Sequence, residues 1–465
     1  MGTPVGRAVI AAATLGSGMA FLDGTVLNVA LPSIGRDLDA SFAELQWITN
    51  GYLLSLASLI LLGGSLGDRF GRRRVFVVGV AWFALASLVC GLASSPEVLI
   101  AARLVQGAGA ALLTPGSLAM IQGVFHHEDR PRAIGAWSGL GGIAAAVGPF
   151  VGGLLIDHVS WRWIFLINLP IAVITVLVAV RWVPETRDPD PPERFDLAGS
   201  AAATLALAGV TYALVQWGAP VAVAAAALGA ASAAAFVLVE RHSAQPMMPL
   251  GMFASRTFSA ANLMTLLVYA ALGAVFFFLA IQLQTVGGYS ALEAGMATLP
   301  VTFCMLFLAS RGGALGERIG PRLPMTVGPL VMALGTLLLL GVDRDFGYWR
   351  DVLPGLVVFG LGLALMVAPL TATVLAAAPD EHVGIASGVN NAVARSGSLL
   401  AIAALPLAVG LSGDEYAEPV AFDAAYGTAM VLCAALLTAG GVVSWFTIRP
   451  TVLADQAPEP STPHE

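Results

Sequence analysis

The sequence contains no lysine, few charged residues and only three cysteines. Charged residues make up 11% of its 465 positions and hydrophobic residues 57%, against roughly 25% and 45–50% in soluble domains. Cys90, Cys304 and Cys433 lie singly within apolar stretches, which excludes a disulfide framework. A net charge of −7 argues against nucleic-acid binding. Because no phosphate-binding glycine loop or metal-ligand cluster is present, we predict no enzyme activity, no cofactor and no metal site.

The chain is instead a series of apolar stretches, each long enough to cross a bilayer. Fourteen can be marked, at 8–31, 47–66, 75–94, 98–121, 133–156, 162–182, 197–216, 220–239, 258–283, 294–311, 324–341, 352–376, 384–409 and 424–447. With the N-terminus inside, the inner loops and tails hold 16 arginines and the outer loops four, the asymmetry typical of cytoplasmic loops. We predict a multi-pass protein of a bacterial inner membrane, with both termini cytoplasmic.

One charged loop occurs twice. Residues 64–74 and 313–323 both read Gly-x-Leu-Gly-acid-Arg-x-Gly-x-Arg, and the second copy begins 249 positions after the first (313 against 64). Such a repeat between apolar stretches indicates two related membrane halves. We predict six-helix bundles over 1–182 and 255–449, a linker with two additional membrane helices over 183–254, and a disordered cytoplasmic tail over 450–465.

Four stretches carry recognisable motifs. They are the loop at 64–74, Leu-Asp-Gly-Thr-Val-Leu-Asn-Val-Ala-Leu-Pro at 22–32, Arg-Leu-Val-Gln-Gly-Ala-Gly-Ala at 103–110 and Gly-Pro-Phe-Val-Gly-Gly at 148–153. In this order they resemble the major facilitator superfamily, and within it the fourteen-helix drug:proton antiporters of the QacA and EmrB type. The resemblance covers essentially the whole chain and implies an all-α membrane protein with the major facilitator fold.

The resemblance also implies a function, because 148–153 matches the antiporter motif. It implies proton-coupled efflux of hydrophobic drugs or antibiotics by alternating access, performed by a monomer. A dedicated exporter of an endogenous metabolite or lipid is the main alternative. A proton-coupled importer fits the antiporter motif less well, and a non-transporting scaffold does not explain charges retained inside the membrane.

Asp23 is the only acidic residue that we place deep inside an apolar stretch. A carboxylate in hydrocarbon is costly, so it must face a cavity, find a partner or take up a proton. We therefore predict that Asp23 couples transport to protons. Arg103 is expected at a similar depth, and the resemblance implies a role in proton transfer. The alternatives are a packing hydrogen bond for Asp23 and a fixed ion pair for Arg103.

Two kinds of segment are candidates for conformational change. We expect the repeated loops to hold the halves together in the outward-facing state, or otherwise only to set topology. Their candidate residues are Gly64, Asp68, Arg69, Gly71, Arg72, Glu317 and Arg318. Gly148 and Pro149 remove a helical hydrogen bond and bend the helix, although a lone proline is common in membrane helices.

The resemblance places the substrate cavity between helices 1, 2, 4 and 5 and their repeat mates. Candidate residues, for each of which packing is the alternative, are Asn28, Tyr52, Trp137, Tyr269, Phe277, Gln282, Asn390 and Arg395. A single interior acid suits a neutral, zwitterionic or singly charged molecule better than a dication. The expected partners are a hydrophobic small molecule, protons and the lipid bilayer.

Overall fold

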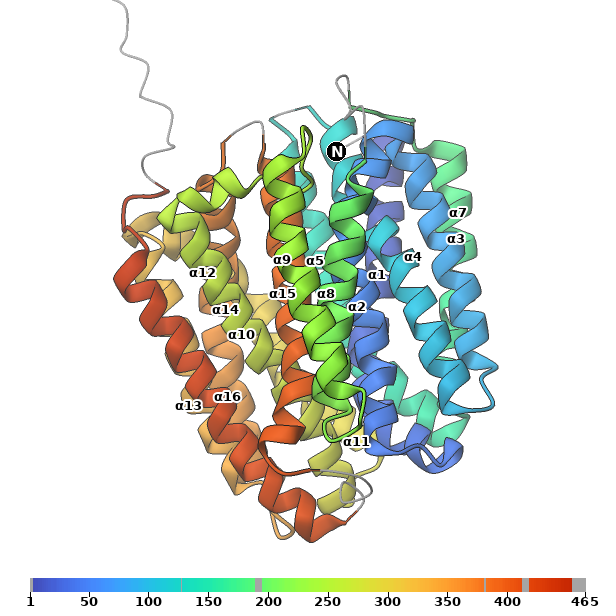
Figure 1. Ribbon diagram of the computed structural model, residues 1–465, viewed down its shortest axis with the longest axis vertical. Helices are drawn as coiled ribbons and strands as arrows, with labels where there is room; N and C mark the ends of the chain where they lie inside the picture. The colour runs from blue at the N-terminus through green and yellow to red at the C-terminus, as the bar shows by residue number, and fades with distance from the viewer. Residues whose placement is uncertain (1–2, 127, 189–194, 380–381, 412–417, 454–465) are drawn as a thin grey trace, which may run out of the picture.

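The computed structural model describes residues 3–126, 128–188, 195–379, 382–411 and 418–453. Over these ranges the chain folds into helices without strands, and fourteen helical segments are long and apolar enough to cross a membrane (Figure 1). The predicted class and number of spans are therefore confirmed. Residues 454–465, most of the predicted disordered tail, lie outside the described ranges.

Six spans form the N-terminal half. They are α1 (Pro4–Leu38), α2 (Phe42–Phe70), α3 (Arg72–Gly91), α4 (Pro96–Val124), α5 (Arg130–His158), and α6 (Trp163–Leu166) with α7 (Asn168–Trp182). α1 is longer than the stretch predicted for it, because the Thr3 side chain caps its first turn and the helix continues through Pro32. It ends only where Asp39 adopts a left-handed conformation with a φ of 51°.

Six more spans form the C-terminal half, after a short helix η1 (Leu250–Ala254). They are α10 (Arg256–Ile281) with η2 (Gln282–Val286), α11 (Ala291–Ala297) with α12 (Leu299–Ile319), α13 (Arg322–Leu338) with η3 (Leu339–Gly341), η4 (Tyr348–Val352) with α14 (Leu353–Ala376), α15 (Val383–Ala408) and α16 (Pro419–Thr447). Gly71 and Gly320, at equivalent positions of the repeated loops, both have positive φ, 112° and 81°. A left-handed turn that glycine tolerates at no steric cost thus recurs in both halves.

The two remaining spans, α8 (Leu197–Val215) and α9 (Ala222–His242), form a hairpin between the halves in the chain. α8 packs on α2 of one half and on α15 of the other, so the hairpin lies over the seam between the halves (Figure 1). The rings of Trp47 and Tyr212 are 6.1 Å apart at this contact. Within the hairpin, Gly209 and Gly229 let the two backbones approach so closely that neither position has room for a side chain.

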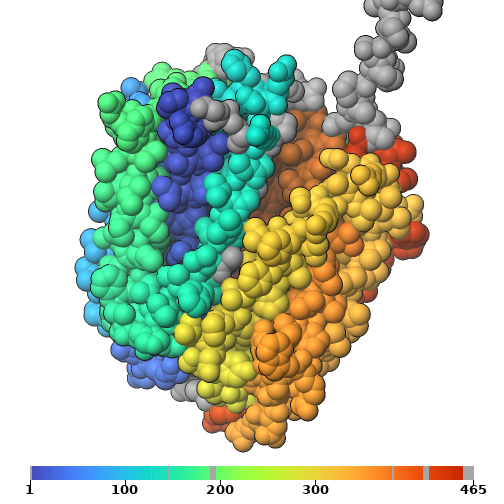
Figure 2. Space-filling model, turned by 180° about the vertical axis from the view of Figure 1, so that it is seen from behind, coloured from blue at the N-terminus to red at the C-terminus, as the bar shows by residue number. Residues whose placement is uncertain are grey.

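The fourteen spans place the start of α1 and the end of α16 at one end of the bundle, which we call the termini face. The halves are joined near the opposite face. There Gln46 Nε2 of α2 donates to the carbonyl of Ile402 in α15 (2.7 Å), and Gln284 Nε2 donates to the carbonyl of Val29 in α1 (2.9 Å). Toward the termini face, Figure 2 shows a recess between α5 and α12. The space between the halves therefore opens toward the termini face.

Candidate functional site

Helices α1 and α4 bring the two interior charges together. Arg103 Nη1 donates to Asp23 Oδ2 at 2.6 Å, and each side chain is only 1% exposed. Arg103 Nε also donates to the carbonyl of Ile48 in α2 (3.1 Å), and its guanidinium carbon lies 4.4 Å from the centroid of the Tyr52 ring. A buried ion pair persists only when further hydrogen bonds satisfy its remaining polar atoms.

Gln106 supplies those further hydrogen bonds. Its Nε2 donates to Asp23 Oδ1 (2.9 Å) and to Ser87 Oγ of α3 (2.8 Å), and its Oε1 accepts from Arg103 Nη1 (2.5 Å). Asn168 Nδ2 of α7 donates to the same Ser87 hydroxyl at 3.4 Å. We call these five residues the buried polar cluster. It connects α1, α3, α4 and α7, and Gln106, Ser87 and Asn168 are fully buried in it.

The sequence predicted no functional role for Gln106, Ser87 or Asn168. One signal was available for Gln106, which follows Arg103 by three positions and therefore lies on the same face of α4. The other two residues carry no charge and stand in helices made mostly of apolar side chains.

The hydrogen bonds define what a proton on Asp23 would do. Both carboxylate oxygens accept a hydrogen bond, one from Arg103 and one from Gln106. Protonation turns an acceptor oxygen into a donor, so one of these two bonds must break. Arginine stays charged in proteins, so if its bond to Asp23 breaks, Arg103 keeps only the Ile48 carbonyl and Gln106 Oε1 as acceptors. The cluster can therefore exist in two arrangements that differ by one proton.

Replacing Gln106 by methionine should lower the thermal stability of the protein. Asp23 Oδ1 and Arg103 each lose a hydrogen bond in a buried setting, at a cost of about 1–3 kcal/mol per unsatisfied group. The measurement is the apparent Tm in detergent. Gln216→Met is the control, since the side-chain amide of the half-buried Gln216 makes no hydrogen bond to any described residue. Equal Tm changes for the two variants would show that Gln106 adds nothing to the cluster.

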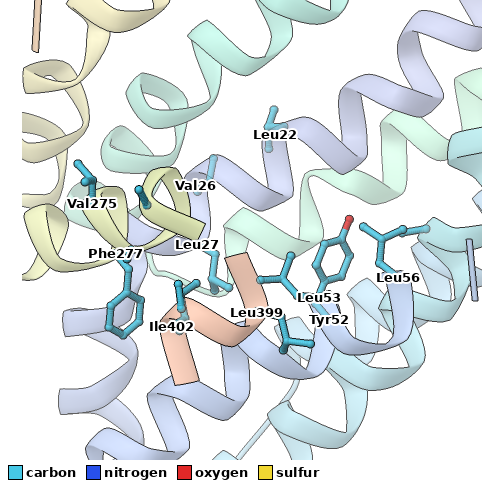
Figure 3. Packing of buried hydrophobic residues seen from close by; sticks show 14 of the residues in the cluster. Leu22, Val26, Leu27, Tyr52, Leu53, Leu56, Val275, Phe277, Leu399 and Ile402 are labelled. Atoms are coloured by element: carbon cyan, nitrogen blue, oxygen red, sulfur yellow. The ribbon is translucent and has the colours of Figure 1, made fainter. Parts of the chain in front are cut away.

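The C-terminal half contributes Arg395 from α15. It is half-buried and makes no ion pair with any described residue, and it lies within electrostatic range of Tyr52 in α2 and Tyr269 in α10. Figure 3 shows Tyr52 among the side chains of Leu53, Leu56 and Leu399, where α2 meets α15. Arg103 and Arg395 thus act on one tyrosine from different halves.

The other substrate candidates are placed less favourably for a ligand. Gln282 donates to the carbonyl of Val342 and to Asp423, and Phe277 is fully buried among apolar side chains (Figure 3). Trp137 Nε1 of α5 donates to Ser17 Oγ of α1 at 3.2 Å. Their side chains serve helix packing in this structure.

The last two candidates differ from each other. Asn390 Nδ2 donates to Thr265 Oγ1 (2.8 Å), which ties α15 to α10. Asn28 is half-buried on α1 and makes no side-chain hydrogen bond to any described residue. The side-chain amide of Asn28 and the guanidinium of Arg395 are therefore available to a ligand.

The first repeated loop contacts its own half and the linker that follows α7. Asp68 pairs with Arg72 at 2.8 Å, and Glu185, which follows α7, pairs with Arg73 (3.6 Å) and Arg74 (3.7 Å). The Arg69 guanidinium carbon lies 5.0 Å from the centroid of Phe195. Gly64 meets Pro115 of α4, and Glu317 and Arg318 are exposed and make no ion pair within the described ranges. None of these contacts, all between described residues, joins one half to the other.

The Gly-Pro segment of α5 lies between the two halves. On one side a side chain at Gly148 or Gly152 would collide with Thr25 or Val26 of α1. On the other side Gly153 leaves no room before the backbone of Leu292 in α11. Asp157, at the end of α5, accepts from the backbone N–H groups of Ala291 (3.1 Å) and Leu292 (2.8 Å) and caps α11.

On the other side of the seam, Gly295 of α11 leaves no room for a side chain before the carbonyl of Pro149 in α5. Pro149 and Gly153 are therefore part of a close contact between α5 and the C-terminal half, whereas Gly139 and Gly142 of α5 have open space beside them. The motif adjoins α1, which carries Asp23, and α11 at once.

Comparison with known proteins gives a consistent family. The family model described as "Major Facilitator Superfamily" matches residues 13–402 and 261–464. The chain is 36% identical over 400 residues to the tetracenomycin C resistance and export protein of Streptomyces glaucescens, covering 85% of this chain and 74% of that protein. It is 34% identical over 442 residues to the methylenomycin A resistance protein of Bacillus subtilis, covering 92% and 93%.

Solved structures with the same fold include transporters of other substrates. A D-xylose–proton symporter has a TM-score of 0.69 at 15% identity and covers 96% of this chain and 98% of its own. A bacterial homologue of the human drug peptide transporters has a TM-score of 0.71 at 10% identity, covering 97% and 100%. At these identities the likeness concerns the fold alone.

Proposed function

The chain belongs to the Major Facilitator Superfamily, and on that premise we propose that it exports a hydrophobic drug or antibiotic in exchange for protons. It is a multi-pass membrane transporter related to antibiotic resistance and export proteins. The proposal adds the driving ion, the direction of transport and the residues that couple the two.

The observation that carries the proposal is the Asp23–Arg103 ion pair inside the buried polar cluster. With Asp23 ionised the carboxylate is held by Arg103 and Gln106, and with Asp23 protonated one of these bonds is released. We assign the first arrangement to the inward-facing state after proton release, and the second to the outward-facing state after proton uptake. Each proton that enters then resets the transporter for one export step.

The orientation follows from charge. Arginine is concentrated in loops at the termini face, which under the positive-inside rule is the cytoplasmic side of the bacterial inner membrane. The recess between α5 and α12 then opens to the cytoplasm, and contacts such as Gln46 with Ile402 close the outer side. The protein transports as a monomer, since each chain holds both halves and one complete cluster.

The charges restrict the substrate. Asp23 is neutralised by Arg103, and Arg395 adds a second arginine within electrostatic range of Tyr52, with no carboxylate partner among the described residues. A dication would therefore meet net positive charge, so we propose a neutral, zwitterionic or singly charged hydrophobic compound. Several relatives are named for single antibiotics, among them a probable actinorhodin transporter of Streptomyces coelicolor at 35% identity. This observation favours a dedicated exporter of an endogenous metabolite as the second candidate.

Proton flux in reconstituted vesicles tests the proposal. Liposomes containing the protein are loaded with a pH-sensitive dye, a pH gradient is imposed, and neutral antibiotics, lipophilic monocations and a dication are added in turn. We expect neutral or monocationic members to dissipate the gradient and the dication to leave it intact.

Protein-free liposomes exposed to the same compounds measure their passive proton leak. If no compound moves protons while radiolabelled compound still accumulates in the protein-containing vesicles, proton coupling is wrong and export by another driving force remains. If one metabolite alone is active, the dedicated exporter is the correct alternative.

A further inference from the structure

A basic cavity lies at the termini face of the C-terminal half, between α10, α13 and α16. Its volume is about 660 Å³ and its lining includes Arg256, Arg322 and Arg449, with no described acidic residue. None of the three arginines makes an ion pair with any described residue. We propose that this cavity binds the headgroup of an anionic phospholipid from the leaflet at the termini face.

Arg322 is the fixed part of the cavity. It is the first residue of α13, and its guanidinium carbon lies 4.1 Å from the ring centroid of Trp445 in α16. Its Nε is buried and lacks a hydrogen-bond acceptor. A buried donor without an acceptor costs free energy until one arrives. A phosphate oxygen is such an acceptor, and it forms charge-assisted hydrogen bonds with a guanidinium.

The repeat provides an internal comparison. Arg322 occupies in its loop the position that Arg73 occupies in the other, 249 residues earlier (322 against 73). Arg73 has a counter-charge, because Glu185 accepts its backbone N–H at 3.0 Å and pairs with its guanidinium at 3.6 Å. Glu185 follows the end of α7 and packs against Gly71, while in the C-terminal half Pro450 follows α16 and packs against the equivalent Gly320.

A carboxylate therefore neutralises Arg73 in the N-terminal half, and no described carboxylate neutralises Arg322 at the equivalent position of the C-terminal half. Where the N-terminal half has Glu185 just beyond its last helix, the C-terminal half has Arg449 and Pro450. Pro450 stands in place of the carboxylate, and Arg449 beside it raises the positive charge around Arg322 instead of neutralising it. The first turn of α13 adds to it, because the N-terminal end of a helix dipole is positive and its cap, Pro321, provides no side-chain hydrogen bond.

The walls of the cavity identify the anion as a lipid. Leu263, Trp445 and Phe446 line it and are 45%, 42% and 79% exposed, on helices long and apolar enough to cross a membrane, so acyl chains can reach them. Basic pockets between membrane helices, at the depth of the headgroups, recognise anionic phospholipids in this way. A free phosphate would use the arginines but would gain nothing from these apolar side chains.

Native mass spectrometry of the purified full-length protein tests the site, with dioleoyl phosphatidylglycerol as the probe and dioleoyl phosphatidylcholine as the neutral lipid. We expect wild type to retain phosphatidylglycerol preferentially. Arg322→Gln with Arg449→Gln should weaken that binding roughly thirtyfold, and either change alone roughly fivefold. Arg311→Gln is the matched control, because Arg311 is an exposed basic residue of the same half, on α12, that does not line the cavity.

Arg449→Glu separates lipid binding from folding. It places a carboxylate in the cavity, one residue before the position that Glu185 occupies in the other half, so it should abolish the preference for phosphatidylglycerol while the Tm in lipid-free detergent stays at or above that of wild type. Equal retention of the two lipids by wild type, or unchanged phosphatidylglycerol binding by the double variant, would overturn the proposal. Displacement of the lipid by millimolar inorganic phosphate would overturn its assignment to a lipid.

Discussion

Asp23→Asn is expected to reduce substrate-driven proton flux to background while substrate exchange continues. Asparagine keeps the size of the side chain and can still accept from Arg103, but it cannot take up and release a proton. In this structure the carboxylate it replaces is 1% exposed and bonded to both Arg103 and Gln106. The measurement pairs proton flux with exchange of labelled against unlabelled substrate, without a pH gradient, in the same vesicles.

Folding must be separated from coupling in this variant. Removing the charge of Asp23 leaves Arg103 as an uncompensated buried charge, which costs about 3–5 kcal/mol in comparable pairs. Exchange activity reports on the folded fraction, and Asp23→Glu should recover part of the proton flux because it restores the carboxylate.

Asp37→Asn is the matched control for this experiment. It makes the same substitution in the same helix, where Asp37 pairs with Arg162 at 2.6 Å and its side chain is 49% exposed. Coupling should survive there. Proton flux that persists in Asp23→Asn at the wild-type ratio to exchange would remove Asp23 from the mechanism.

Charge made Asp23 and Arg103 predictable from sequence. Charged residues are so costly in hydrocarbon that any interior one stands out, and equal depth suggested that the two could meet. The number of spans was predictable for the same physical reason, since bilayer thickness sets the length of an apolar stretch. The end of α1 was not, because a proline at position 32 suggests a terminus and neighbouring helices allow the chain to continue through it.

The uncharged part of the cluster was beyond this reasoning. Amides and hydroxyls occur in many spans, and whether one faces a charge or a neighbouring backbone depends on how each helix is rotated about its axis. Gln106 and Gln282 illustrate the difficulty. The first, to which no role was assigned, donates to Asp23, and the second, a substrate candidate, donates to Val342 and Asp423. Only the packed structure distinguishes them.

Gly153→Ala is expected to open the outer closure and to lower transport strongly. The added methyl group would collide with the backbone of Leu292 and lie 2.8 Å from the carbonyl oxygen of Ala291, and backbone atoms cannot move aside as a side-chain tip can. Overpacking of this kind costs about 1–3 kcal/mol, which corresponds to roughly a 5- to 150-fold shift between two conformational states. The collision exists only when α5 and α11 are in contact, as they are in the state closed at the face opposite the termini face. That state should therefore bear the whole cost.

Spin labels at Val159 and Met296, in an otherwise cysteine-free protein, measure this closure across the seam. Both positions are exposed, one just beyond α5 and one on α11. Gly153→Ala should move the distance distribution to longer values, while Gly135→Ala, on the same helix with no atom within 4 Å of its added methyl group, should leave it unchanged. An unchanged distribution in Gly153→Ala would mean that the α5–α11 contact does not set the balance between states. In that case the glycines of the antiporter motif would act through α1, where Gly148 and Gly152 pack against the helix that carries Asp23.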